Sequence, residues 1–159
     1  MMRIDERFIA APAEDCFRVA ADVERWPAIL PHYRWVRFLD RKAFGTGRVE
    51  MAAWRDFGPV RYPTWWVSDM HVVEQEPAIH FVHVDGITRR MIVKWSFHPV
   101  SGGTDVSISH AWDGPHWPLI GGFAWRHVIG PRFVSVIAAR TLAGVAREAE
   151  RRAREARHA

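Results

Sequence analysis

Apolar and polar residues alternate along most of the chain between residues 33 and 112, which predicts a long succession of β-strands. The pattern is cleanest on either side of a Gly-Gly loop at residues 102 and 103. The strand before the loop turns four residues to one face: Met91, Val93, Trp95 and Phe97. The strand after it does the same with Val106, Ile108, His110 and Trp112. One face of each strand is therefore expected to lie on a core and the other in water.

The expected elements follow one another in a simple order. A strand over residues 3 to 10 precedes a helix that Pro12 opens and a short helical piece over residues 26 to 31. Six strands then cover residues 33–41, 47–57, 60–75, 78–85, 90–98 and 106–112, with a tight-turn signal at Asp85-Gly86. The helical period returns over residues 131 to 156. Its apolar stripe consists of Val134, Ile137, Ala138, Thr141, Leu142 and Val145.

This order predicts an α+β protein in which a long C-terminal helix packs against a seven-stranded antiparallel sheet. A sheet with this many strands tends to curl. One helix with one apolar stripe does not fill a wide concave face, so a cavity is expected in the unfilled part. The nine tryptophans fit either a bulky core or the lining of a cavity for a flat or greasy ligand, and the sequence leaves both open.

Length, cysteine content and hydropathy restrict the class of protein further. The 159 residues are expected to form one domain over residues 1–159, long enough to bury a core without disulfides. Cys16 is the only cysteine, which fits a reducing compartment. The N-terminus has no apolar run of signal-peptide length, and no uncharged apolar stretch of about 18 residues occurs. We therefore expect a cytoplasmic protein that is not integral to a membrane.

The net charge of +4 is carried by 20 Arg and 2 Lys. Near the C-terminus Glu148, Glu150 and Glu155 interleave with arginines, a pattern typical of a solvated helix face. Neither zinc-finger spacing nor an RNA-recognition motif accompanies the charge. Nucleic acid is therefore not an expected partner.

Three stretches carry a resemblance to a known family. They read APAEDCFRVAADVERWPAILPHYRWVRFL, VKWSFHPVSGGTDVSISHAW and IAARTLAGVAREAERR. Together they resemble the START/Bet v 1-like (SRPBCC) superfamily, and more narrowly its polyketide cyclase/dehydrase and lipid-transport group. The resemblance covers nearly the whole chain and implies a helix-grip fold, in which a curved antiparallel sheet grips a long C-terminal helix around a ligand cavity. It implies cyclase, aromatase or lipid-carrier activity only weakly, because function in such a fold depends on the cavity.

Motifs for cofactors and metals are missing from the sequence. There is no GxGxxG before a helix, no P-loop and no HExxH. His80 and His83 would face opposite sides of one strand, and Cys16 has no evident base partner. We expect no cofactor and no metal.

The candidate catalytic residues are polar side chains that strand parity can turn inward. Val106 and Ile108 place His110 on the core side, where a core imidazole and a pocket imidazole remain equally open. Arg89 shares parity with Met91 but lies next to a turn, where a solvent-facing arginine is favoured; turned inward, it would bind an enolate or phenolate.

The strand over residues 60 to 75 offers two alternative inner faces. One consists of Trp65, Val67, Asp69, His71 and Val73, the other of Trp66, Ser68, Met70 and Val72. The pattern does not decide between them. If the first set points inward, His71 becomes an acid or base with Asp69 beside it. Arg55 shares a face with Met51 and would also reach the cavity, and Tyr62 is a further phenolic donor.

We therefore predict a cavity that holds a hydrophobic, aromatic or polyketide-like small molecule. The predicted catalytic residues are His110, Arg89 and His71. The predicted ligand-binding residues are Trp65, Trp95, Trp112, Met91, Arg55, Asp69 and Phe81. Such a site would cyclise or aromatise its substrate mainly by positioning it, with acid or base help.

The alternative is a non-catalytic carrier or chaperone of a quinone, isoprenoid or fatty lipid. A WPLIGGFAW segment exposed at the cavity mouth, residues 117–125, would favour a carrier that contacts membranes, because Trp prefers membrane interfaces. Two titratable groups converging deep in the cavity would favour the enzyme. The sequence leaves open whether the chain is a monomer or a homodimer.

Overall fold

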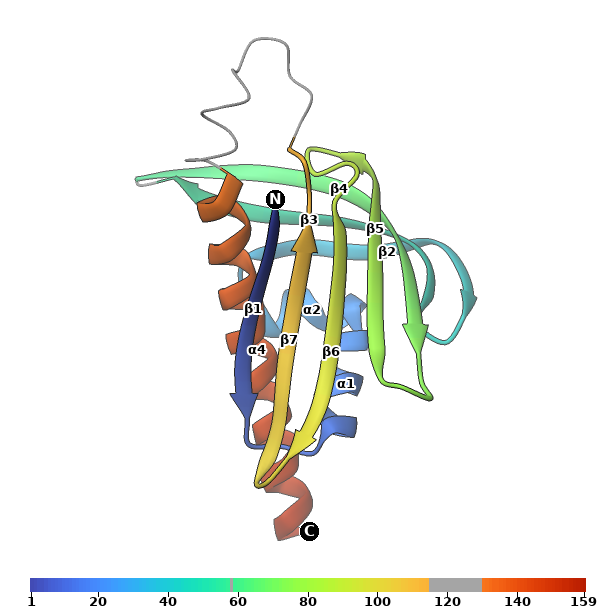
Figure 1. The fold of residues 1–159 in the computed structure, drawn as a ribbon, viewed down its shortest axis with the longest axis vertical. Coiled ribbons are helices and arrows are strands. Elements are labelled where there is room, and N and C mark those ends of the chain that lie inside the picture. The colour runs from blue at the N-terminus through green and yellow to red at the C-terminus, as the bar shows by residue number, and fades with distance from the viewer. Residues whose placement is uncertain (58, 115–129) are drawn as a thin grey trace.

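Seven antiparallel strands form a curved sheet in the computed structural model, which describes residues 1–57, 59–114 and 130–159. The strands are β1 (Met2–Ile9), β2 (Tyr33–Ala43), β3 (Thr46–Phe57), β4 (Val60–Val73), β5 (Ala78–Gly86), β6 (Ile92–Val100) and β7 (Gly103–Ala111). They lie in the order β1-β7-β6-β5-β4-β3-β2 (Figure 1). From β2 to β7, strands that follow one another in the sequence are therefore neighbours in the sheet, as antiparallel hairpins allow.

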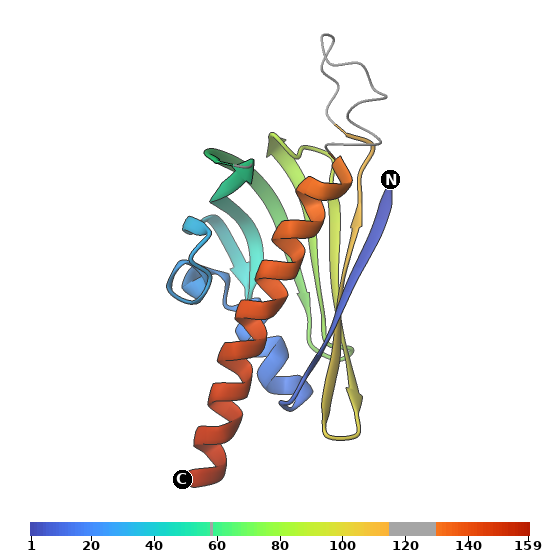
Figure 2. The same ribbon diagram turned by 90° about the vertical axis from the view of Figure 1, so that its left-hand side faces the viewer.

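Helices lie on the concave side of this sheet. Between β1 and β2 come α1 (Ala13–Ala21), the 3₁₀ helix η1 (Val23–Arg25) and α2 (Trp26–Ile29). The long helix α4 (Gly130–His158) runs across the concave face, with the strands curving around it (Figure 2). This is the helix-grip arrangement, and the predicted fold and order of elements are confirmed.

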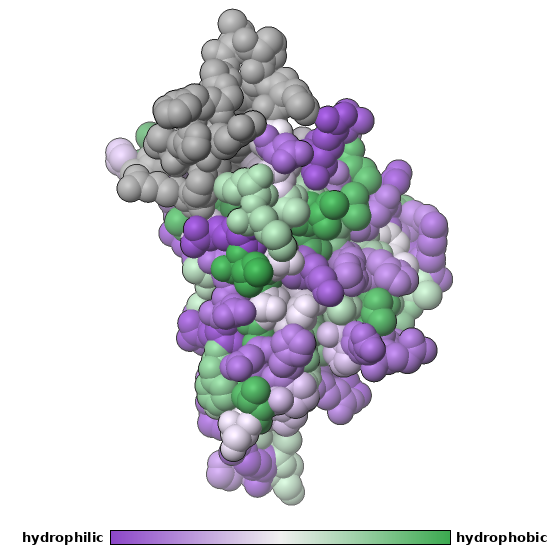
Figure 3. Space-filling model, viewed as in Figure 1, coloured by the Kyte–Doolittle hydropathy of each residue, from purple (hydrophilic) through white to green (hydrophobic). Residues whose placement is uncertain are grey.

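Strand alternation sets what faces α4. In β7, Thr104, Val106, Ile108 and His110 are buried. Asp105, Ser107 and Ser109 alternate with them on the convex face. Figure 3 shows hydrophilic residues over much of the described part of that face, with apolar residues scattered among them. The stripe predicted on α4 is also buried, apart from the half-buried Ile137.

The structure decides the parity of β4. Trp66, Ser68 and Met70 are at most 3% exposed and face the concave side. A register shift against β5 occurs between Val67 and Ser68. Just before this shift, Gly86 pairs with Trp66 and has a φ of +89°, and a Cβ on it would come within 2.4 Å of the Trp65 carbonyl oxygen. Only glycine fits this close approach of two strands.

The connection from β5 to β6 differs from the prediction. β5 continues through Asp85 and Gly86, and the turn spans residues 87–90 instead. The Arg90 amide donates to the His83 carbonyl oxygen at 2.8 Å, and the His83 amide donates to the Met91 carbonyl oxygen at 2.9 Å. These two hydrogen bonds hold the turn against β5. They place the residues of the turn at one end of the concave face of the sheet, which we call the trough.

Candidate ligand cavity

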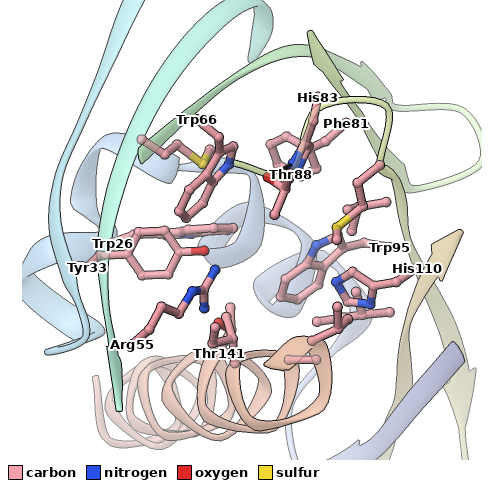
Figure 4. Close-up of a pocket in the computed structure, with 17 residues that line it drawn as sticks. Trp26, Tyr33, Arg55, Trp66, Phe81, His83, Thr88, Trp95, His110 and Thr141 are labelled. Carbon is pink, nitrogen blue, oxygen red and sulfur yellow. Dashed lines mark hydrogen bonds between the residues drawn. The ribbon is translucent and has the colours of Figure 1, made fainter. Parts of the chain in front are cut away.

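A cavity lies between the concave face of the sheet and the N-terminal half of α4 (Figure 4). It is lined by Trp26, Tyr33, Met51, Arg55, Trp66, Phe81, His83, Thr88, Met91, Val93, Trp95, Ile108, His110, Val134, Ile137, Ala138 and Thr141. Its empty volume is about 550 Å³ including solvent at its mouth, of which about 70 Å³ admits the centre of a water molecule. One water needs roughly 10–15 Å³ on that measure, so the gap is narrow but takes a guest larger than water.

Aromatic rings in mutual contact form one wall of the cavity. The Trp26 ring lies 5.0 Å from the Tyr33 ring in an edge-to-face arrangement and 6.0 Å from the Trp95 ring. Tyr33 in turn meets Trp66 edge-on at 6.0 Å. Such ring pairs fix one another in orientation, so this wall presents a preformed apolar surface to a flat ligand.

Arg55 brings a positive charge into the cavity. It comes from β3, is only 6% exposed, and its guanidinium carbon lies 5.4 Å from the centre of the Trp66 ring. Burial lowers its pKa to about 10, so the group remains protonated at neutral pH. None of the described residues that line the cavity is acidic.

His110 comes from β7, lies across the cavity from Arg55 (Figure 4), and is 9% exposed. Burial, with the nearby Arg55 and Arg3, lowers its pKa to about 4, so the imidazole is neutral at pH 7. Its Nδ1 has no hydrogen-bonding partner among the described residues. A buried polar atom of this kind is costly unless something pairs with it, so the site suits a ligand with a polar group there.

Two further polar groups complete the lining. Nδ1 of His83 and Oγ1 of Thr88 are joined by a 2.6 Å hydrogen bond, and the His83 ring stacks on Trp66 at 5.9 Å. Burial, with His110 and Arg55 nearby, lowers the pKa of His83 to about 3. Burial also raises the pKa of Tyr33 to about 12, so its phenol stays protonated. Figure 4 shows the Tyr33 hydroxyl and the Arg55 guanidinium side by side at the cavity.

The structure brings five of the residues predicted from the sequence together in this lining. They are His110, Arg55, Trp95, Met91 and Phe81. Strand parity placed four of them, His110, Arg55, Trp95 and Met91, and the alternation holds around them in β3, β6 and β7. Met91 lies one residue before β6 and is still buried on the side of Val93 and Trp95.

Three predicted residues lie on the convex face instead, because β4 turns its other side inward. Trp65 is 38% exposed, and its indole nitrogen donates to Oε1 of Glu50 at 2.7 Å. Asp69 accepts two hydrogen bonds from Arg48, at 2.7 and 3.0 Å. His71 is exposed. None of the three lines the cavity, so the set containing Asp69 and His71 is not the inner one.

Arg89 and Trp112 are also outside the lining. Arg89 is exposed in the turn at residues 87–90, before β6 begins, where strand alternation no longer applies. Trp112 is buried, and its indole nitrogen donates to the Arg89 carbonyl oxygen at 3.1 Å. Trp112 therefore anchors the turn that carries Thr88, rather than forming the cavity wall. Tyr62, the further phenolic candidate, is 51% exposed.

Sequence reasoning missed several lining residues. His83 follows Phe81 at strand spacing and could have been placed inward by the same parity as Phe81. Trp26 and Tyr33 come from a short helix and a strand beginning, where no period is long enough to give a direction. Thr141 was assigned to the apolar stripe of α4 but not to the site.

Other functional chemistry is not evident in the described part of the chain. No three His, Cys, Asp or Glu side chains among these residues are placed to hold a metal ion. None of the described helices has the length and apolar sequence to span a bilayer. Burial raises the pKa of Cys16 to about 11, which keeps its thiol protonated. Residues 117–125, the segment considered for membrane contact, lie outside the described residues.

A curved sheet, a gripped helix and a cavity between them define a START/Bet v 1-like, or SRPBCC, protein. The family described as polyketide cyclase / dehydrase and lipid transport matches residues 9–139, and the chain belongs to that family. No curated protein matches the sequence at a significant level.

Solved structures share the fold over nearly the whole chain. The Zhui aromatase/cyclase from Streptomyces sp. R1128 is 20% identical with a TM-score of 0.78, over 96% of each chain. TTHA0849 from Thermus thermophilus is 19% identical with a TM-score of 0.76, over 94% of this chain and 97% of that one. The di-domain ARO/CYC BexL from the BE-7585A biosynthetic pathway is 25% identical with a TM-score of 0.72, over 94% of this chain and 46% of that one.

Proposed function

We propose that the chain binds an aromatic or polyketide-like molecule bearing an acidic oxygen in this cavity and promotes its cyclisation and aromatisation. The observation that carries the proposal is that Arg55 and His110 are both buried on walls of one aromatic-lined cavity. Membership of the family and the likeness to proteins described as aromatase/cyclases support it. Arg89 and His71, which lie outside the lining, have no part in it.

The charge of the cavity favours an anion over a cation or a purely apolar guest. Arg55 stays protonated in a lining without described acidic residues, so an enolate or phenolate oxygen would find its counter-charge there. Such a pairing is stronger in a buried site than in water. The neutral phenol of Tyr33 beside Arg55 supplies a second donor for the same oxygen.

The neutral His110 gives the cavity a base. In a poly-β-ketone, a CH₂ between two carbonyl groups would lose a proton to the imidazole, leaving an enolate whose oxygen faces Arg55. The enolate carbon then attacks another carbonyl carbon of the same chain, a C–C bond forms, and the resulting alkoxide takes the proton back from the imidazolium. The imidazole then removes a second proton from the carbon next to the new C–OH group. That hydroxyl takes the proton from the imidazolium and leaves as water, and a ring C=C bond forms. Each step balances without an oxidant or a metal.

Folding the flexible chain is the larger task in this reaction. The rings of Trp26, Trp95 and Trp66 would hold a ketone chain in one bent conformation, which is catalysis by positioning. The His83–Thr88 hydrogen bond fixes a second polar group beside Trp66. This group would limit the orientations that a carbonyl of the bound ketone chain can take.

A fluorescence titration tests the binding step. Tryptophan quenching by 1-naphthol is compared with quenching by 1-methoxynaphthalene, which has the same rings but no ionisable oxygen. We expect the wild type to prefer 1-naphthol by about tenfold, and Arg55→Met to lose most of that preference, because a hydrogen bond to a charged group contributes about 1.5–3 kcal/mol. Arg48→Gln, on the convex face, is the matched control and should leave the preference unchanged.

Two further measurements separate the enzyme from a carrier. Native mass spectrometry of the protein purified from its own host should show a retained polyketide-derived aromatic. Incubation with a synthetic poly-β-ketone should yield a dehydrated product with the wild type and much less with His110→Gln. A retained acyl lipid or isoprenoid quinone, with no product formed, would assign the chain to the carriers and end the cyclase proposal.

A further inference from the structure

A second hollow lies beside the ligand cavity, between the start of β2, the start of β4 and the middle of α4. It is lined by Pro31, His32, Arg61, Arg140, Ala143 and Arg147, and we call it the arginine pocket. Its empty volume is about 580 Å³ including open solvent, of which about 280 Å³ admits the centre of a water molecule. More of this pocket than of the ligand cavity admits water, and three arginines line it where one, Arg55, lines the cavity.

Positive charge exceeds negative charge at this pocket. Three of its six lining residues are arginines and none is acidic. The carboxylate paired with them is that of Asp56, which Arg140 reaches at 2.6 Å and Arg61 at 3.8 Å. The hydrogen bond from Arg140 lowers the pKa of Asp56, so this carboxylate is ionised at neutral pH. Three guanidinium groups against one carboxylate leave an excess of two positive charges.

The arginines are partly held in place. Arg61 lies over the Trp54 ring at 5.1 Å, and Arg34 also lies over that ring, at 4.7 Å. Asp56 fixes Arg140. Arg147, exposed on α4, forms no ion pair with any of the described residues and is therefore able to meet an incoming anion. Ordering two of three cationic groups beforehand lowers the entropy cost of binding.

The arginine pocket and the ligand cavity are separate sites that share a boundary. Nε2 of His32, which lines the pocket, and Oγ1 of Thr141, which lines the cavity, are joined by a 3.1 Å hydrogen bond. Arg140 and Thr141 are consecutive on α4, with Arg140 lining the pocket and Thr141 the cavity. An anion in the pocket would not occupy the cavity.

We infer that the arginine pocket binds a phosphate group, either of a soluble phosphate or of a lipid headgroup. Guanidinium groups present paired N–H donors that match the oxygens of a phosphate, and three arginines line this hollow, which is large enough to hold one. This inference goes beyond the proposed function and does not depend on what the ligand cavity holds.

Isothermal titration with inorganic phosphate tests the soluble source. Co-sedimentation with phosphatidylglycerol vesicles, against phosphatidylcholine vesicles, tests the lipid source. The test variants are Arg147→Gln and Arg61→Gln, and the matched control is Arg154→Gln, which removes an exposed arginine of the same helix outside the pocket. Circular dichroism checks that each variant is folded.

We expect saturable binding in one of the two arms, weakened about tenfold by Arg147→Gln and by Arg61→Gln and less than about twofold by Arg154→Gln. Binding should also weaken as salt is added, since the partners are charged. Arg55→Met should leave phosphate binding intact, which separates this inference from the cavity proposal. Absence of saturable binding in both arms, or equal losses in all three arginine-to-glutamine variants, would overturn the inference.

Discussion

The two halves of α4 meet the same sheet in different ways. From Leu142 onward, in what we call the solid half, the helix packs against α1 and β1, and most of its buried residues there are small: Val145, Ala146, Ala149 and Ala153. Between Val134 and Thr141, in what we call the hollow half, the helix borders the ligand cavity instead. The difference lies in α1, which contacts α4 and lies beside its C-terminal half (Figure 2). Phe17 and Val19 of α1 are buried in the core.

At the cavity end, aromatic side chains take the place of a second helix. The rings of Trp26, Tyr33 and Trp66 come from elements at the side of the trough and reach toward its centre. Rings that meet edge to face leave gaps, whereas a packed helix fills the space beside it. Arg55 keeps its surroundings from closing further, because packing apolar side chains around a charged group is costly. One short helix, α1, thus accounts for the difference: the trough is packed where α1 lies beside α4 and hollow where it does not.

The largest expected effect on stability comes from truncating a buried side chain of α1, which packs beside the solid half of α4. Phe17→Ala should lower the free energy of unfolding by about 3–5 kcal/mol, because Phe17 is 7% exposed and packs edge-on against Phe97 at 5.6 Å. Ile137→Ala, in the hollow half, should cost only about 1 kcal/mol, since this side chain is half-buried and already borders empty space. Urea unfolding of both variants measures the difference.

Equal losses for Phe17→Ala and Ile137→Ala would contradict the comparison. They would mean that the side chains around the cavity pack as tightly as those beneath α1. The sequence predicted the strands and the long helix better than it predicted the full set of residues that line the cavity.

The long helix and the regular strands follow from local periodicity in both halves. The stripe on α4 and the alternation in β6 and β7 each extend over enough residues to fix which face is buried. The predicted bounds of α4, residues 131 to 156, lie within two residues of the observed Gly130–His158. In β7, alternation alone places Val106, Ile108 and His110 inward, and all three are buried.

Other candidate positions were less predictable, because they lie where the period breaks or is ambiguous. β4 carries tryptophan on both faces, so Trp65 and Trp66 gave no direction until the packing against β5 was known. The turn after Gly86 begins later than its Asp-Gly signal indicates, which moved Arg89 out of the strand. Positions near turns depend on tertiary hydrogen bonds, and one sequence does not contain them.

As the pH is lowered, the hollow half should lose stability before the solid half does. Burial lowers the pKa of His110 to about 4, below the unfolded value of 6.5, so the unfolded chain binds more protons between these values. The stability that comes from a neutral His110 is present above pH 6.5 and is lost as the pH falls to about 4. That loss amounts to roughly 3 kcal/mol for this one group.

In the solid half the titrating group is Glu148. Hydrogen bonds from Arg151 and Arg152 lower its pKa to about 2, so its contribution holds above pH 4.5 and fades only as the pH falls toward 2. Near-ultraviolet circular dichroism, which reports aromatic packing around the cavity, should therefore change at higher pH than the far-ultraviolet signal of the helices. His110→Gln should make the stability profile between pH 6.5 and 4 less steep than in the wild type. Burial also lowers the pKa values of His32 and His83, and these two groups account for the slope that remains. Coincident acid transitions by both signals would refute the ordering.

The smallest effect concerns two tryptophans whose indoles both donate hydrogen bonds, one at the cavity end and one on the convex face. Trp112→Phe removes the bond to the Arg89 carbonyl oxygen at 3.1 Å in a buried setting, and should cost about 1–2 kcal/mol. Trp65→Phe removes a bond to Glu50 at a site that is 38% exposed, and should cost only about 0.5 kcal/mol because water replaces the partner.

The two variants should differ in where the structure loosens as well as in how much. The turn that Trp112 anchors carries Thr88, whose side chain holds His83, and the Met91 amide donates to the Thr88 carbonyl oxygen at 3.0 Å. In Trp112→Phe the amides of Arg90 and Met91 should exchange hydrogen faster than in the wild type, and in Trp65→Phe they should not. Unchanged exchange at both amides would mean that the His83–Met91 backbone pairing alone holds the turn, and that Trp112 contributes packing rather than support for the cavity rim.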